Sequence, residues 1–291
     1  MTHAPAEALH ELAHRLLSPD DCARWIALLR PGLRLAHADD GPVAGRLGGL
    51  PDLPLGMPWP EWDGHGPLSH LMSLDCAALS AAGDSGLALP ASGTLLFFLL
   101  DGRLDDEDCM VYPGDPGTRA GSRVLHVPAG TPTRRHPAPD ALSPYPEVAL
   151  TAQAGLSVPT SDAPTVRAAF GEGLDTRAWR THPVNARPFD SALRALDTHP
   201  SRSGHRIGGH PVPVQEPVEW EVARGVLGPE AVGQDARLDE AAAEWVLLAQ
   251  IDTDEAADMM WGDAGTVYWL IRPADLAAGR FEEAMFTWQC C

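Results

Sequence analysis

The chain has 291 residues, of which 44% are hydrophobic, so it is long enough for about two domains and can bury a sizeable core. It contains no lysine, which excludes a Walker-type phosphate loop, a Schiff-base lysine and a kinase-type strand lysine. Its formal net charge of −19 disfavours nucleic acid and anionic membranes as partners.

The sequence predicts a cytoplasmic location. No apolar run approaches the roughly 18 residues of a membrane helix. Glu7, His10 and Glu11 would interrupt the apolar core of a signal peptide. The five cysteines are odd in number and form no Cys-x-x-Cys pair, which favours reduced, mostly buried thiols over a disulfide frame or a zinc knuckle.

Two short helices are predicted at the N-terminus. The apolar stripe of the first helix consists of Leu9, Leu12, Ala13, Leu16 and Leu17, which recur at helical spacing. Ser18 is expected to cap the second helix, with Pro19 in its first turn and Asp21 as the capping-box partner. Pro31 and Gly32 are expected to end it.

Three sequence blocks then occur twice in the same order. Arg46-Leu-Gly-Gly-Leu-Pro51 returns as Arg206-Ile-Gly-Gly-His-Pro211, 160 residues later (206 − 46). The second block is 71–75 and 248–252, and the third is 93–100 and 265–271. They predict a turn with positive-φ glycines, a strand ended by aspartate and a strand buried on both faces. Three ordered blocks favour an internal duplication.

These features divide the chain into four segments within one compact unit. They are an N-terminal helical segment at 1–40, a first repeat half at 41–130, a connecting segment at 131–203 and a second repeat half at 204–291. The connecting segment is predicted to hold a strand at 148–158 and helices near 164–170 and 190–196. Apolar and polar residues alternate over 284–290, which predicts a final half-buried strand.

At these blocks the chain resembles the YwqG-like family, bacterial proteins grouped as a domain of unknown function. The matching stretches are 45–54 with Trp59-Pro60, 67–75, 93–98, 208–215, 247–252, 261–265 and Asp275-Leu276. Two positions depart from the family pattern, because His210 replaces a tyrosine and Ser73 replaces a glutamine. The resemblance implies an α+β fold of mixed, mostly antiparallel sheets with an internal repeat, and it implies no reaction. Some relatives are encoded near toxin systems, which implies a binding or immunity role.

One motif suggests zinc chemistry. His10-Glu11-Leu-Ala-His14 matches His-Glu-x-x-His, in which two histidines one helical turn apart hold the metal and the glutamate activates its water. The motif lies at the extreme N-terminus and lacks the metzincin extension. All three side chains also lie off the apolar stripe of their helix, so a solvated helix face is the interpretation we favour.

An acidic loop carries a second candidate metal site at Asp252 and Asp254. Clustered carboxylates are ligands for Ca²⁺ or Mg²⁺, but Ala256 and Ala257 replace the ligand and the glycine that a calcium loop needs. We favour turn capping for these carboxylates.

A third candidate is a cleft between the two repeat halves. Its predicted ligand-binding residues are those that the repeated blocks and their flanking loops bring to both sides of one groove: Arg46, Trp59, Asp75, Arg206, Gln215, Gln250, Asp252, Trp261 and Asp263. For most of them, core packing and pairing with nearby acids are the competing interpretation.

The sequence thus favours a non-enzymatic binding module with a basic protein partner, since no catalytic constellation is complete and the chain is strongly acidic. We expect no cofactor. Two alternatives stay open: a zinc-dependent hydrolase using His10, Glu11 and His14, and a small-ligand carrier using the cleft between the halves.

Overall fold

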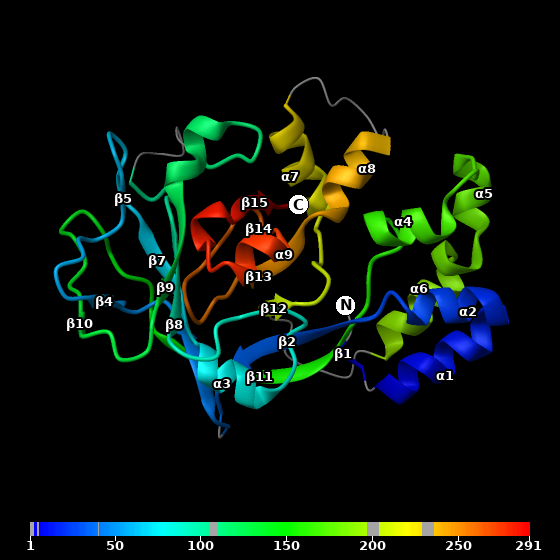
Figure 1. Ribbon diagram of the computed structural model, residues 1–291, viewed down its shortest axis with the longest axis horizontal. Helices are drawn as coiled ribbons and strands as arrows, with labels where there is room; N and C mark the ends of the chain where they lie inside the picture. Colours follow the sequence, from blue (N-terminus) through cyan, green and yellow to red (C-terminus); the bar gives the residue numbers. More distant parts are fainter. Residues whose placement is uncertain (1–2, 5, 40, 105–109, 197–203, 229–235) are drawn as a thin grey trace.

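A single large antiparallel sheet forms the centre of the molecule (Figure 1). The computed structural model describes residues 3–4, 6–39, 41–104, 110–196, 204–228 and 236–291. Over these residues the sheet has 11 strands, in the order β15-β14-β13-β12-β2-β11-β3-β7-β8-β9, with β1 added alongside β11. Helices pack around it, so the α+β class and the mostly antiparallel pairing are confirmed.

The strands of this sheet are β1 (His3–Ala4), β2 (Arg30–His37), β3 (Val43–Leu47), β7 (Ser69–Asp75), β8 (Thr94–Leu99), β9 (Ser122–Val127), β11 (Val148–Ser157), β12 (Arg206–Gly208), β13 (Val246–Asp252), β14 (Thr266–Ile271) and β15 (Met285–Gln289). Among the described residues, two further sheets have two antiparallel strands each: β4 (Asp52–Pro54) pairs with β10 (Thr133–Arg135), and β5 (Glu61–Trp62) pairs with β6 (Gly66–Pro67).

The helices are α1 (Ala6–Leu16), α2 (Pro19–Ile26), α3 (Cys76–Ala82), α4 (Pro164–Phe170), α5 (Thr176–Thr181), α6 (Arg187–Ala195), α7 (Val218–Leu227), α8 (Ala236–Ala243) and α9 (Pro273–Ala277). Short 3₁₀ turns lie at Pro116–Gly121, Pro183–Asn185 and Phe281–Glu283. No helix in the described ranges is long and apolar enough to cross a membrane.

The N-terminal helices form as the sequence predicts. The Ser18 side chain accepts a hydrogen bond from the Asp21 backbone N–H (3.2 Å) and donates one to the Asp21 carboxylate (2.9 Å). The structure corrects the end of this segment, however. Helix α2 stops at Ile26, and β2 begins at Arg30, so Pro31 and Gly32 belong to a central strand of the sheet. The segment 1–40 is therefore not purely helical.

The sheet has two wings joined by β2 and β11. The first wing is β3-β7-β8-β9, and the second is β12-β13-β14-β15. Arg46 of β3 pairs with Ser73, as Arg206 of β12 pairs with Gln250. In both wings the next pairing has a register shift, between His70 and Met72 in one and between Leu247 and Ala249 in the other. The internal duplication stays a prediction, which these matching registers favour.

The two wings face each other across the main hydrophobic core. Phe97 of β8 and Trp269 of β14 meet edge to face with ring centroids 5.3 Å apart. The Trp269 indole N–H also donates to the Ser122 hydroxyl of β9 (2.8 Å). A second core joins α1 and α2 to the connecting helices, through Trp25 against Phe189, and these helices gather on one side in Figure 1.

The described cysteines are free thiols. Cys22 and Cys76 are buried, Cys290 is half-buried and Cys291 is exposed, whereas Cys109 lies outside the described residues. Burial raises the pKa of the Cys76 thiol to about 11, so it stays protonated at neutral pH.

The Gly-Gly turns provide a test of the fold. Gly208 has φ of +67°, and a Cβ there would lie 2.0 Å from the Ser85 carbonyl oxygen. We expect Gly208→Ala to lower the free energy of unfolding by at least about 3 kcal/mol, since backbone must move as well as adopt a disfavoured φ. The matched control is Gly64→Ala, with φ of +81° and open space around the added methyl group. It should cost only about 1 kcal/mol in urea unfolding. Equal losses in the two variants would contradict the close approach at Gly208.

Candidate functional site

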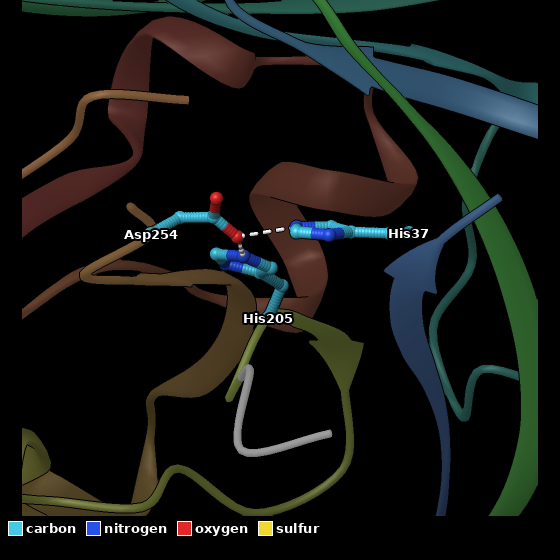
Figure 2. Close-up of side chains that lie close together, drawn as sticks. All are labelled: His37, His205 and Asp254. Atoms are coloured by element: carbon cyan, nitrogen blue, oxygen red, sulfur yellow. Dashed lines mark hydrogen bonds and ion pairs between the residues drawn. The ribbon is translucent and has the colours of Figure 1, made fainter. Parts of the chain in front are cut away.

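Two histidines and an aspartate from distant parts of the chain meet beside the second wing. His37 ends β2, His205 immediately precedes β12, and Asp254 follows β13 in the loop that leads to β14. Strand β12 lies between β2 and β13 and pairs with both, so it brings the three segments together. Figure 2 shows both imidazoles directed at the Asp254 carboxylate.

One carboxylate oxygen of Asp254 is the centre of this cluster. Its Oδ2 atom lies 2.6 Å from His37 Nε2 and 3.0 Å from His205 Nε2. The other oxygen, Oδ1, accepts the Ala257 backbone N–H at 3.0 Å. The side chains of His205 and Asp254 are 0% and 3% exposed, whereas that of His37 is 42% exposed. The carboxylate is thus buried and fully engaged, and solvent reaches the cluster at His37.

The environment keeps this carboxylate ionised. Burial alone would raise the pKa of Asp254, but hydrogen bonds from His205, His37 and the Ala257 N–H outweigh it. The net effect lowers the pKa of Asp254 well below its ordinary value of 3.8. A buried negative charge is therefore present at neutral pH, stabilised by three donors.

The tautomer of His205 follows from the hydrogen bond at its other ring nitrogen. Nδ1 accepts a hydrogen bond from the Asp252 backbone N–H (3.0 Å), and a backbone N–H can only donate. Nδ1 therefore carries a lone pair, and the proton of the neutral imidazole is on Nε2, where it is donated to Asp254.

This arrangement bears directly on metal binding. Among the described residues, His37, His205 and Asp254 are the one group of three ligand-type side chains within reach of a single ion. A histidine ligand needs a free lone pair on the coordinating nitrogen and usually donates its other N–H to an acceptor. His205 shows the opposite pattern, so metal binding through Nε2 would require breaking the bond from Asp252. In this arrangement the cluster is a hydrogen-bonded clamp.

The clamp holds the loop that connects β13 to β14. Asp254 and Met259 exchange two backbone hydrogen bonds (2.8 and 2.9 Å), which closes a tight turn. Thr253, directly before Asp254, joins the two ends of the loop: its hydroxyl donates to Gly265 O (3.0 Å) and accepts from the Trp261 N–H (3.3 Å). We call residues 253–265 the clamp loop. Its position is fixed at both ends, so Met260, Trp261 and Gly262 are held in place.

These three residues form one wall of a cavity of about 170 Å³ between the two wings. Val267 of β14, with Phe286 and Trp288 of β15, continues the second-wing side. The first-wing side consists of Leu99, Leu100, Asp101, Gly102, Met110 and Val111. The cavity is mostly apolar, and both halves of the chain line it.

The predicted cleft residues fall in several places. In the second half, Arg206, Gln250 and Asp252 converge on Gly204: the arginine and the amide donate to its carbonyl oxygen (3.2 and 3.1 Å), and Asp252 accepts its N–H (3.0 Å). Gln215 donates to Cys290 O (2.7 Å). This half therefore holds most of its predicted polar groups in internal hydrogen bonds.

The first-half residues lie apart from one another. Arg46 bonds to Leu50 O (3.0 Å) and pairs with Asp52 (3.1 Å), the buried Trp59 donates to Leu68 O (2.8 Å), and Asp75 caps α3. Of the predicted ligand-binding residues, Trp261 lines the cavity, and the exposed Asp263 follows in the same loop. Their binding roles stay predictions.

The His-Glu-x-x-His motif lies on α1 and shares no residue with the clamp. His10 is half-buried, whereas Glu11 and His14 are exposed, and His14 Nδ1 lies 3.4 Å from Cys22 Sγ. Over the described residues, no third ligand joins His10 and His14. Of the other acidic-loop candidates, Asp254 joins the clamp, and Asp252 accepts from Gly204, Thr253 and Thr266.

Removing the clamp charge should loosen the fold. We expect Asp254→Asn to cost about 3 kcal/mol of unfolding free energy, because an amide offers one acceptor where three donors converge. The control is Asp258→Asn, an exposed carboxylate of the same loop, which should change it by under about 0.5 kcal/mol.

The loss of unfolding free energy in Asp254→Asn should also depend on pH. The native pKa of Asp254 lies below the unfolded value, so its stabilising effect is complete above about pH 4 and declines as the pH falls further. Urea unfolding of both variants at several pH values measures this. A loss for Asp254→Asn no larger than that of Asp258→Asn would show that the carboxylate holds nothing.

Comparison with known proteins identifies a family whose function is unknown. No curated protein matches the chain significantly. The more specific resemblance to the YwqG-like family, stated from the sequence, stays a prediction. The family described as "Domain of unknown function (DUF1963)" matches residues 45–290, which include nearly all of both wings, the cavity, and His205 and Asp254 of the clamp. The match spans most of the chain, and the protein therefore belongs to the DUF1963 family.

Proposed function

We propose that the protein is a non-enzymatic binding module for a basic protein partner. The observation that carries this proposal is the cavity between the wings, because the clamp loop that forms one of its walls also has exposed carboxylates elsewhere along it. We also propose a cytoplasmic location. The resemblance to the YwqG-like family implies that the binding role is of the immunity type.

Charge distribution supports a basic partner. Many arginines are satisfied internally by carboxylates, as in Arg24 with Asp21 and Arg280 with Asp275. In the clamp loop, Glu255, Asp258 and Asp263 are exposed, and no described cation forms an ion pair with them. Unpaired surface carboxylates attract a cationic surface at long range and speed its association.

The loop also offers an apolar contact. Met260 is 58% exposed and lines the cavity, directly beside the buried Trp261. Protein interfaces commonly have an apolar or aromatic centre within a polar rim, and methionine adapts well to different partners. The combination of a recess, an exposed methionine and surrounding carboxylates fits this anatomy.

The clamp does not favour catalysis over binding. Asp254 and His37 resemble the orienting aspartate and the general-base histidine of a hydrolytic triad, but no described hydroxyl or thiol hydrogen-bonds to His37. A nucleophile would have to lie within hydrogen-bond reach of that imidazole.

A second candidate, a small-ligand carrier, is favoured by the mostly apolar lining of the cavity. The two functions predict different effects on binding when the exposed carboxylates of the clamp loop are neutralised. A protein partner would be sensitive to them, whereas a small molecule enclosed by apolar walls would not.

Affinity capture from native lysate tests the proposal. With the full chain as bait at about 50 mM salt, we expect a stoichiometric basic protein that is lost at about 300 mM. The triple variant Glu255→Gln/Asp258→Asn/Asp263→Asn should recover it at least about tenfold less well. The control Glu61→Gln/Asp63→Asn/Glu172→Gln changes the charge equally at exposed sites outside the clamp loop and should capture normally.

Two results would count against a protein partner. One is the absence of any stoichiometric protein where control baits succeed, and the other is equal capture by both triple variants. Stabilisation of the purified chain by a small metabolite, unchanged by the clamp-loop variant, would support the carrier instead.

A further inference from the structure

The walls of the inter-wing cavity combine aromatic rings with a single charge. Trp261, Trp288 and Phe286 supply the rings, and Asp101 supplies the carboxylate. Among the described lining residues, Asp101 is the one charged group. Outside this lining, the Arg103 guanidinium lies over the ring of Tyr145 (4.4 Å to the centroid), and the Tyr145 phenol bonds to Asp101. A recess lined by aromatic rings and one carboxylate has a chemical preference for a cation.

The Asp101 carboxylate is held in position. Its Oδ2 accepts the Tyr145 phenol O–H at 2.7 Å, and its Oδ1 accepts the Arg103 backbone N–H at 3.2 Å. Burial, together with the neighbouring Asp101 charge, raises the pKa of Tyr145 far above its ordinary value, so the phenol remains a donor. A carboxylate has about four lone-pair sites, so capacity remains for a ligand.

The rest of this molecule shows which cation suits such surroundings. The Arg272 guanidinium lies over the Trp245 ring (4.5 Å to the centroid) and bonds to the Glu244 carboxylate (3.0 Å). Arg24 lies in the same way over Phe170 (4.5 Å) while bonding to Asp21 (2.7 Å). In both places one guanidinium stacks on a ring and pairs with a carboxylate, which its flat, forked shape allows. The cavity lining contains the same two kinds of group, rings and a carboxylate, and no described lining residue is an arginine.

We propose that the cavity receives an arginine side chain of the protein partner, with its guanidinium against Asp101 and the aromatic walls. This inference rests on the proposed function and names the anchor of the partner. A volume of about 170 Å³ suits one long side chain and is smaller than the clefts that hold drug-sized ligands. The exposed carboxylates of the clamp loop attract the basic surface that carries the arginine.

A matched pair of peptides tests the occupant directly. The probes are acetyl-Gly-Arg-Gly-amide and the same peptide with citrulline, which keeps the shape of arginine and removes its charge. Titration into the ¹⁵N-labelled full chain is followed through the indole N–H signals, with Trp261→Phe and Trp288→Phe spectra used for assignment. We expect saturable shifts of the Trp261 and Trp288 signals with the arginine peptide, and about tenfold weaker binding of the citrulline peptide.

Asp101→Asn keeps the size of the side chain and removes the charge. It should weaken binding of the arginine peptide about tenfold while leaving the citrulline peptide unaffected. Asp63→Asn, an exposed carboxylate of the turn after β5, is the control and should change neither peptide. An unchanged spectrum of other indole signals shows that Asp101→Asn remains folded.

Three results would overturn the arginine anchor: no shift of these two indoles up to about 10 mM arginine peptide, equal binding of citrulline, or equal binding by Asp101→Asn. Capture of a basic protein together with one of these results would leave the binding module standing with another anchor. Binding of the arginine peptide without any captured protein would support the arginine-binding role of the cavity and contradict the proposed protein partner.

Discussion

The organisation of the functional region depends on one buried ionised carboxylate. An isolated charge in a protein interior is unfavourable by several kcal/mol, so Asp254 can remain ionised only while its donors stay in place. Two of these donors, His37 and His205, come from segments far away in sequence, and the third is the backbone of its own loop. The charge therefore fixes the relative positions of β2, the start of β12 and the clamp loop. The cavity inherits its shape from this constraint, because Met260 and Trp261 lie on the same loop.

The direction of the hydrogen bonds decides how this cluster is interpreted. Two histidines and one aspartate within reach of each other have the composition of a metal centre. The Asp252 N–H that is donated to His205 Nδ1 fixes the proton on Nε2, and that proton occupies the position where a metal would bind. This one hydrogen bond therefore assigns the cluster a structural role, although its composition is that of a metal centre. Asp252, predicted as a ligand, contributes through its backbone.

The repeated blocks allowed much of the sheet to be predicted, because each is a local pattern: β7, β8, β13 and β14 follow from apolar runs bounded by glycine or aspartate. Strand β2 was missed because Pro31 and Gly32 are typical helix terminators, although here they lie within the sheet. The clamp had no sequence signal, since His37 and Asp254 are 217 residues apart and meet only because β12 inserts between β2 and β13. Of its three residues, Asp254 alone was recognised as a candidate ligand. Asp101 was missed because its environment is created by the second wing.

Hydrogen exchange of the clamp loop tests the central claim most directly. The Ala257 N–H is bonded to the Asp254 carboxylate and the Met259 N–H to the Asp254 carbonyl, whereas Trp269 lies in β14 within the core. Asp254→Asn should speed exchange at residues 257 and 259 by at least about tenfold, whereas exchange at the Trp269 amide should rise only with the loss of global stability. Unchanged exchange at 257 and 259 would show that the carboxylate does not hold this loop.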